Sequence, residues 1–270
     1  MLTPDMVALK ARLKATWMSG DYGHFAQYLE PGALEYLKRL EIAPGTRVLD
    51  IGCGAGQLAI PAAKAGADVT GIDIASNLIE EAQLRAEVEG VTVRFEEADA
   101  EELPFPDASF DLVVSLIGAM FAPRPDRVVA EMVRVCHPGA RIAIASWTPE
   151  GHVGQMFRII AKHFPPPALM PSPTKWGDEA SVRERLGKRT SKLAMTRRLY
   201  PLRYPFSPAE VVEFFFQFYG PTLRALEELD AWHQEKLRKE LTQLWTANNK
   251  AKDGTTFVEA EYLDVTARRN

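Results

Sequence analysis

VLDIGCGAGQ, residues 48–57, decides the fold class of this chain. The apolar part, 48–51, predicts a buried strand, and the three glycines within 52–56 predict a tight turn. The composition of the following segment, QLAIPAAKAG (57–66), predicts a helix. A strand, a glycine turn and a helix in this order are typical of a nucleotide-binding α/β crossover, because glycine lets the backbone approach a ligand closely.

The spacing of the glycines separates two classes of cofactor. A dinucleotide site uses G-x-G-x-x-G and places a pyrophosphate at the helix N-terminus. This chain has G-x-G-x-G over residues 52–56, just after Asp50, which lies two residues before the first glycine. The Asp50 carboxylate would repel a pyrophosphate and attract a cationic amino-acid group. Asp73 ends the next predicted strand, 68–72, and an acid at such a position typically binds ribose hydroxyls. The pattern therefore favours a nucleoside with a positively charged amino-acid tail, a description that S-adenosylmethionine meets.

Four segments resemble the class I S-adenosylmethionine-dependent methyltransferases. They are VLDIGCGAGQ (48–57), VTGIDIASNLIEEA (69–82), FEEADAEELPFPDASFD (95–111) and RVCHPGARIAIASW (134–147). The likeness is strongest to the type 11 group of small-molecule methyltransferases, which includes those of quinone biosynthesis. The resemblance implies S-adenosylmethionine as cofactor, S-adenosylhomocysteine as product and a small organic molecule as methyl acceptor.

The resemblance also implies which residues bind the cofactor. Asp50 would meet the methionine amino group directly or through water, Asp73 would accept both ribose hydroxyls, and Asp99 would accept the exocyclic amine of adenine. A solvated acidic loop is the alternative interpretation of Asp99 and its acidic neighbours. The further cofactor-binding candidates are Gly52, Cys53, Gly54, Gly56, Ile74, Asn77, Ala100, Ser115 and Ile117. The apolar segment SLIGAMFAP (115–123) is expected to wall the cofactor and the substrate pocket.

The catalytic candidates follow from position alone. Displacement at a sulfonium methyl group depends on positioning and water exclusion, and needs a base only if the acceptor must lose a proton. His152 follows the fifth predicted strand at the ligand-binding edge. Tyr22 and His24 lie in an N-terminal segment of the kind that folds over the cofactor in the family. A surface or packing role is the alternative for each of the three.

Regular alternation of apolar runs and helical segments predicts an α/β fold with a doubly wound, mostly parallel sheet. The family layout adds a late antiparallel pair of strands, which makes seven. We interpret the whole chain, 1–270, as a single domain with four parts. These are an N-terminal helical lid (1–44), a cofactor-binding core (45–150), a helical cap with a late strand (151–255) and the last strand (256–270). Within it, Ser76 is expected to cap a helix over 76–89, and 221–250 is expected to be one long helical stretch.

Composition limits the partners. The 270 residues carry a net charge of −4, which argues against a nucleic-acid substrate. With two cysteines, no signal-peptide core and no membrane-length apolar run, a cytoplasmic protein is predicted, and no His/Cys cluster has the spacing of a metal site. Aromatic residues in 151–205 and 207–225 suggest an apolar or aromatic acceptor, although core packing explains most of them. Two other functions stay open: a nicotinamide-dependent oxidoreductase and a non-catalytic S-adenosylmethionine-binding protein.

Overall fold

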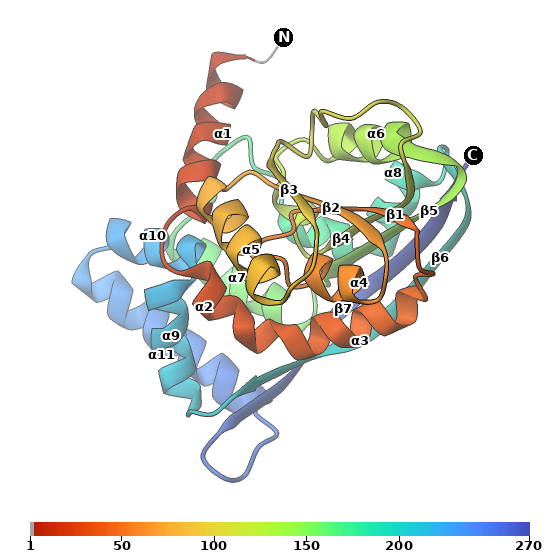
Figure 1. Cartoon of the computed structure of the whole chain (residues 1–270). Helices are drawn as coiled ribbons and strands as arrows, with labels where there is room; N and C mark the ends of the chain where they lie inside the picture. Colours follow the sequence, from red (N-terminus) through yellow and green to blue (C-terminus); the bar gives the residue numbers. More distant parts are fainter. Residues whose placement is uncertain (1–2) are drawn as a thin grey trace.

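A seven-stranded sheet forms the centre of the computed structural model, which describes residues 3–270 (Figure 1). In spatial order its strands are β3 (Arg94–Glu97), β2 (Asp68–Asp73), β1 (Arg47–Ile51), β4 (Phe110–Leu116), β5 (Cys136–Trp147), β7 (Thr256–Arg269) and β6 (Thr190–Tyr204). Strands β1 to β5 pair in parallel, whereas β7 runs antiparallel to both β5 and β6. The predicted doubly wound, mostly parallel sheet of seven strands is confirmed, and so is its late antiparallel pair.

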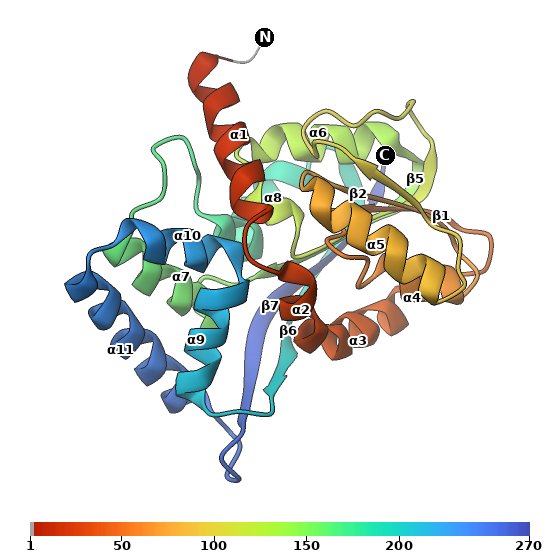
Figure 2. The ribbon, with the colours of Figure 1, turned by 60° about the vertical axis from the view of Figure 1, so that its left-hand side comes forward.

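Helices cover both faces of the sheet and also gather beside it (Figures 1 and 2). One face carries α3 (Glu30–Leu40), α4 (Ala59–Lys64) and α5 (Ser76–Val88), and the other carries α6 (Pro125–Val135) and α8 (Glu179–Leu186). The group beside the sheet contains α7 (His152–His163), α9 (Pro208–Phe218), α10 (Gly220–Glu228) and α11 (Ala231–Asn248). Two N-terminal helices pack against this group: α1 (Pro4–Trp17) contacts α10, and α2 (Tyr22–Ala26) contacts α9. Among the helices so described, none is both long and apolar enough to cross a membrane.

The central strands are apolar along their length because helices bury both of their faces. Val48, Leu49 and Ile51 of β1 are buried, and so are Leu112 and Val114 of β4. An acid interrupts this apolar run near the carboxyl end of β1, at position 50.

The order of the strands reverses beside β1. The chain runs from β1 outward to β2 and β3 and then returns to β4 on the other side of β1. In open α/β sheets, ligands bind in the crevice outside the carboxyl ends of the strands at such a reversal. The glycine turn after β1, the acid at the end of β2 and the segment after β4 are all brought to this crevice.

Two helix boundaries differ from the sequence-based expectation. Ser76 does not cap α5: Ala75 holds the N-cap position, and its amide donates to Asp73 Oδ1 at 3.0 Å. The stretch expected as one helix over 221–250 is two helices, α10 and α11. The backbone is extended at Leu229 and Asp230 between the two helices, and Asp230 caps the second by accepting the amide of His233 at 2.8 Å.

Candidate functional site

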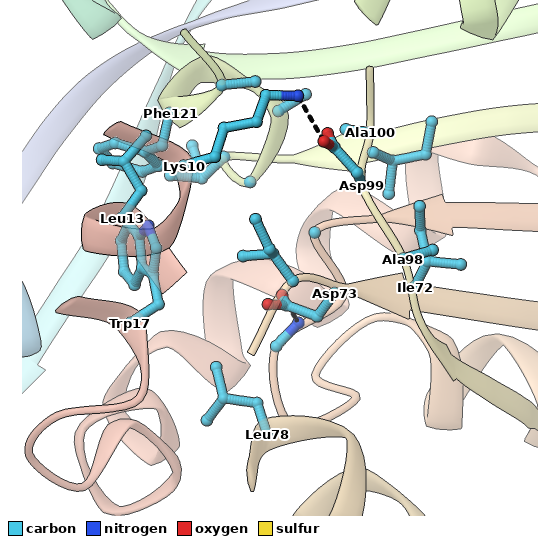
Figure 3. Close-up of a pocket in the computed structure, with 18 of the residues that line it drawn as sticks. Lys10, Leu13, Trp17, Ile72, Asp73, Leu78, Ala98, Asp99, Ala100 and Phe121 are labelled. Carbon is cyan, nitrogen blue, oxygen red and sulfur yellow. Dashed lines mark hydrogen bonds and ion pairs between the residues drawn. The ribbon is translucent and has the colours of Figure 1, made fainter. Parts of the chain in front are cut away.

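A cavity of about 110 Å³ lies at the carboxyl ends of β1, β2 and β4, under α1. Figure 3 shows Lys10, Leu13 and Trp17 of α1 on one side and Asp73 and Asp99 on the other. The lining residues from the predicted cofactor set are Gly52, Gly54, Asp73, Ile74, Asp99, Ala100 and Ile117. Segments far apart in the sequence therefore meet around one space at the reversal of strand order.

The glycine turn after β1 requires its glycines. Gly52 and Gly54 have φ of +70° and +53°, in the left-handed region. A Cβ on Gly52 would lie 2.7 Å from the Cα of Gly118, and a Cβ on Gly118 would lie 2.6 Å from the carbonyl oxygen of Gly52. The backbone after β4 therefore packs directly on the turn, and the two together form one wall of the cavity.

Asp50 lies beneath the cavity rather than on its surface. Its side chain is buried, and Oδ2 has no hydrogen-bond partner. Burial, followed by the charge of Asp73, raises the pKa of the Asp50 carboxyl from 3.8 to about 7. A buried acceptor without a donor favours a nearby cation, because a positive charge would stabilise the ionised form.

Asp73 lies on the cavity wall with a fixed orientation. Its Oδ2 accepts the amide of Gly54 at 3.0 Å, and its Oδ1 accepts the amide of Ala75 at 3.0 Å. Burial raises the pKa of this carboxyl, while these amides lower it. Each carboxylate oxygen has a second lone pair, so the group is able to accept two further hydrogen bonds.

Asp99 belongs to an ion network that joins α1 to the segment after β3. Its Oδ1 accepts the amide of Glu101 at 2.9 Å, and its Oδ2 pairs with Lys10 of α1, as Figure 3 shows. The fully buried carboxylate of Glu101 pairs with Lys10 and also accepts Nε of Arg124 at 2.7 Å. These acids are therefore parts of a structured network between the first helix and the cavity wall.

Two of the remaining candidates shape the wall. Ser115 Oγ donates to the carbonyl of Ile51 at 2.7 Å and accepts the amide of Ala119 at 2.9 Å. Ile117 has φ +68°, which is rare for a β-branched residue and costs about 1–3 kcal/mol. Its amide donates to the carbonyl of Ala145 at 2.8 Å, which helps to hold this strained conformation at the cavity.

Besides Asp50 and Ser115, three candidates from the cofactor set do not line the cavity. Cys53 is buried, and burial raises the pKa of its thiol well above the usual range, so it remains protonated. A Cβ on Gly56 would lie 2.8 Å from Ile60, so this glycine allows close packing of α4. Asn77, in the first turn of α5, is half-buried with Oδ1 unpartnered.

The three catalytic candidates lie in different places, and only Tyr22 lines the cavity. Tyr22 lines the cavity, and burial raises the pKa of its hydroxyl, so the group is a hydrogen-bond donor at neutral pH. His24 is exposed, with its ring 4.6 Å from that of Phe218. His152 packs 4.3 Å from the ring of Trp245, both of its nitrogens lack partners, and burial lowers its pKa to about 4. Neither histidine lines the cavity.

The residues contributed by α1 were missed by the sequence reasoning. Lys10, Leu13 and Trp17 are spaced 3 and 4 residues apart and lie on one helical face. That spacing was visible in the sequence, but it did not indicate what the face covers. The segment 115–123 was expected to form a pocket wall, and most of it does: Leu116 to Ala119 and Phe121 to Pro123 line the cavity. Across the described chain, no group of three or more His, Cys, Asp or Glu side chains is arranged to hold a metal ion.

Comparisons with known proteins indicate a methyltransferase domain in this chain. Residues 49–144 match the family model described as a methyltransferase domain. The chain is 37% identical over 265 residues to the uncharacterized protein Rv1405c of Mycobacterium tuberculosis, an alignment that covers 97% of this chain and 95% of the relative. It is 33% identical over 162 residues to Methyltransferase GfsG of Streptomyces halstedii, which covers 54% of this chain and 58% of that protein.

A solved structure supports the fold. Geranyl diphosphate methyltransferase in complex with SAM is similar at a TM-score of 0.54 and 20% sequence identity. The similarity covers 89% of this chain and 85% of that one. The likeness in fold therefore extends beyond residues 49–144 to the helices that surround them.

Proposed function

Because the chain belongs to the class I S-adenosylmethionine-dependent methyltransferases, we propose that it transfers the methyl group of S-adenosylmethionine to a small organic acceptor. The observation that carries this proposal is the cavity at the strand reversal, where a glycine turn, an oriented Asp73 and a buried Asp50 meet. A nucleoside with a cationic tail needs these three features.

The residues present suit the cofactor. Asp73 would accept the ribose hydroxyls with the lone pairs that Gly54 and Ala75 leave free. Asp50 would stabilise the cationic amino group from beneath the glycine turn. Asp99, on the cavity wall, would accept the exocyclic amine of adenine, and it would have to share its carboxylate with Lys10.

When bound, S-adenosylmethionine would supply an electrophilic sulfonium methyl group. The lone pair of the acceptor would form the new bond to carbon, the C–S electron pair would stay on sulfur, and any proton on the acceptor atom would pass to water. The contribution of this chain is to position the reactants and exclude water. Leu13, Trp17 and Phe121 make the cavity wall apolar on the side away from Asp73. Tyr22 would serve as a hydrogen-bond donor that orients a reactant, because its hydroxyl stays protonated.

The other two catalytic candidates are assigned packing roles in this proposal. His152 is neutral at pH 7, since its pKa is about 4, and it lies against Trp245 outside the cavity. His24 is exposed against Phe218. The proposed reaction therefore uses no histidine base.

Calorimetry on an Asp73→Ala variant tests this function. We expect the wild-type protein to bind S-adenosylmethionine and S-adenosylhomocysteine but not a nicotinamide dinucleotide. Asp73→Ala should weaken binding at least tenfold, because two charge-assisted hydrogen bonds are lost. Asp68→Ala is the matched control, since Asp68 is exposed at the opposite end of the same strand. Equal affinity of both variants would contradict the assignment. Release of S-adenosylhomocysteine with a panel of acceptors would separate an enzyme from a non-catalytic binding protein.

A further inference from the structure

A second, larger cavity of about 640 Å³ adjoins the first. We call it the acceptor chamber. Its walls come from α1, α7, α10 and the proline-rich loop 164–174, which lie together on one side of the molecule in Figure 2. Its volume lies in the range of about 300–1,000 Å³ that is usual for small-molecule sites.

The two cavities share a wall. Leu13, Trp17 and Phe121 line both of them. The rings of Trp17 and Phe121 meet edge to face with centroids 4.9 Å apart, and Tyr219 packs 5.8 Å from Trp17 on the chamber side. A group that passes from a ligand in one cavity to a ligand in the other must therefore cross at these side chains.

The interior of the chamber is apolar, and its charges lie at the rim. The apolar lining includes Phe157, Ile160, Phe164, Pro167 and Met170. Four charged residues line the chamber, and all are exposed: Arg12, Arg158, Arg224 and Glu228. Arg12 and Glu228 pair with each other at 3.1 Å. The serine and threonine hydroxyls that line the chamber are already hydrogen-bonded, that of Thr16 to the carbonyl of Arg12 and those of Ser172 and Thr174 to each other. A polar ligand would therefore lose more hydration than these groups replace, whereas an apolar ligand would gain free energy from burial.

We propose that the acceptor chamber binds a bulky apolar methyl acceptor, with its reacting atom at the Trp17–Phe121 end. This inference rests on the proposed methyl transfer, and it names the class of acceptor. The apolar body would occupy the space between α7 and the loop 164–174, and any charged substituent would point to the rim beside Arg12.

Binding of a fluorescent apolar probe tests the chamber without requiring turnover. 1-N-phenylnaphthylamine would be titrated into the full-length protein, with and without S-adenosylhomocysteine. The test variant is Met170→Lys, which places a charge in the chamber from a loop. Its matched control is Leu169→Lys, because the adjacent Leu169 is 47% exposed and does not line the chamber. If Met170→Lys does not fold, Ala161→Trp fills the chamber from α7 instead, with Ala180→Trp on the exposed side of α8 as its control.

We expect saturable binding to the wild type, at least tenfold weaker binding to Met170→Lys, and binding to Leu169→Lys within twofold of the wild type. The affinity for S-adenosylhomocysteine should stay within twofold in all of these proteins. No saturable binding to the wild type, or equal probe affinities of the test and control variants, would overturn the proposal. Failure of S-adenosylhomocysteine to bind would refute the proposed function instead, and the probe titration would still decide whether the chamber holds apolar molecules.

Discussion

Replacing Asp50 with asparagine tests two expectations about the buried carboxylate beneath the glycine turn. The carboxylate should contribute to cofactor binding, and its ionisation should lower the free energy of unfolding. Burial raises the pKa of Asp50 in the folded protein from 3.8 to about 7. Between these two values the folded state binds more protons at this residue than the unfolded state does. The stability that Asp50 contributes is therefore present at low pH and is lost as the pH rises toward 7. Asparagine has no proton to lose in this range, so the variant should lack this component.

The size of the effect follows from the shift. One pKa unit corresponds to about 1.4 kcal/mol, and about two units of the shift lie between pH 5 and the folded-state pKa. Between about pH 5 and pH 8, the wild type should therefore lose about 3 kcal/mol of unfolding free energy relative to Asp50→Asn.

Urea unfolding of both proteins at the two pH values measures this difference, because subtraction removes the titration of all groups that do not interact with Asp50. Asp68→Asn, an exposed acid on the neighbouring strand, is the control and should keep the pH dependence of the wild type. Calorimetry supplies the second measurement. The affinity of the wild type for S-adenosylmethionine should increase from about pH 6 to pH 8 as Asp50 ionises, whereas that of Asp50→Asn should be at least tenfold weaker at pH 8 and nearly constant.

Either of two results would refute the reasoning. A difference in unfolding free energy that does not change with pH would mean that Asp50 does not titrate in this range. A pH-dependent difference with unchanged cofactor affinity would mean that the carboxylate is buried but takes no part in binding a cation.

Two further substitutions test the contacts around the cavity. Glu101→Ala should destabilise the protein by about 3–5 kcal/mol in urea unfolding, because it leaves Arg124 and Lys10 without their buried partner. Glu97→Ala, which removes an exposed partner of Lys14, should cost less than about 1 kcal/mol, and equal losses would contradict the network. Gly118→Ala should reduce the affinity for S-adenosylhomocysteine at least tenfold and cost about 1–3 kcal/mol, because its Cβ would lie 2.6 Å from the Gly52 carbonyl oxygen. Unchanged affinity in calorimetry would show that the packing of the two glycines does not shape the cavity.

Local chemistry made the strands and the turn around the first cavity predictable from the sequence. Each of these features depends on a single local element. A buried strand requires the apolar run 48–51, the tight turn requires the glycines after it, and the acid stands at the end of β2. Asp73, Gly52 and Gly54 were therefore found from a few neighbouring residues each, and all three line the cavity.

Positions set by packing between distant segments were harder to predict. His152 follows a strand at the ligand-binding edge, as the sequence indicates, but α11 places Trp245 against its ring. Lys10 lies 89 residues from Asp99 in the sequence, and no local sequence pattern predicts their ion pair.

The sequence by itself determined the parallel sheet, the glycine turn and the acids at the strand ends, because hydrophobic periodicity and backbone conformation act over a few residues. Only the tertiary structure decided that α1 covers the cavity, that Trp17 and Phe121 divide it from the acceptor chamber, and that Asp50 is buried deeply enough to shift its pKa. The physical reason is that side-chain contacts and desolvation depend on which distant segments pack together, and this packing is settled by the fold as a whole.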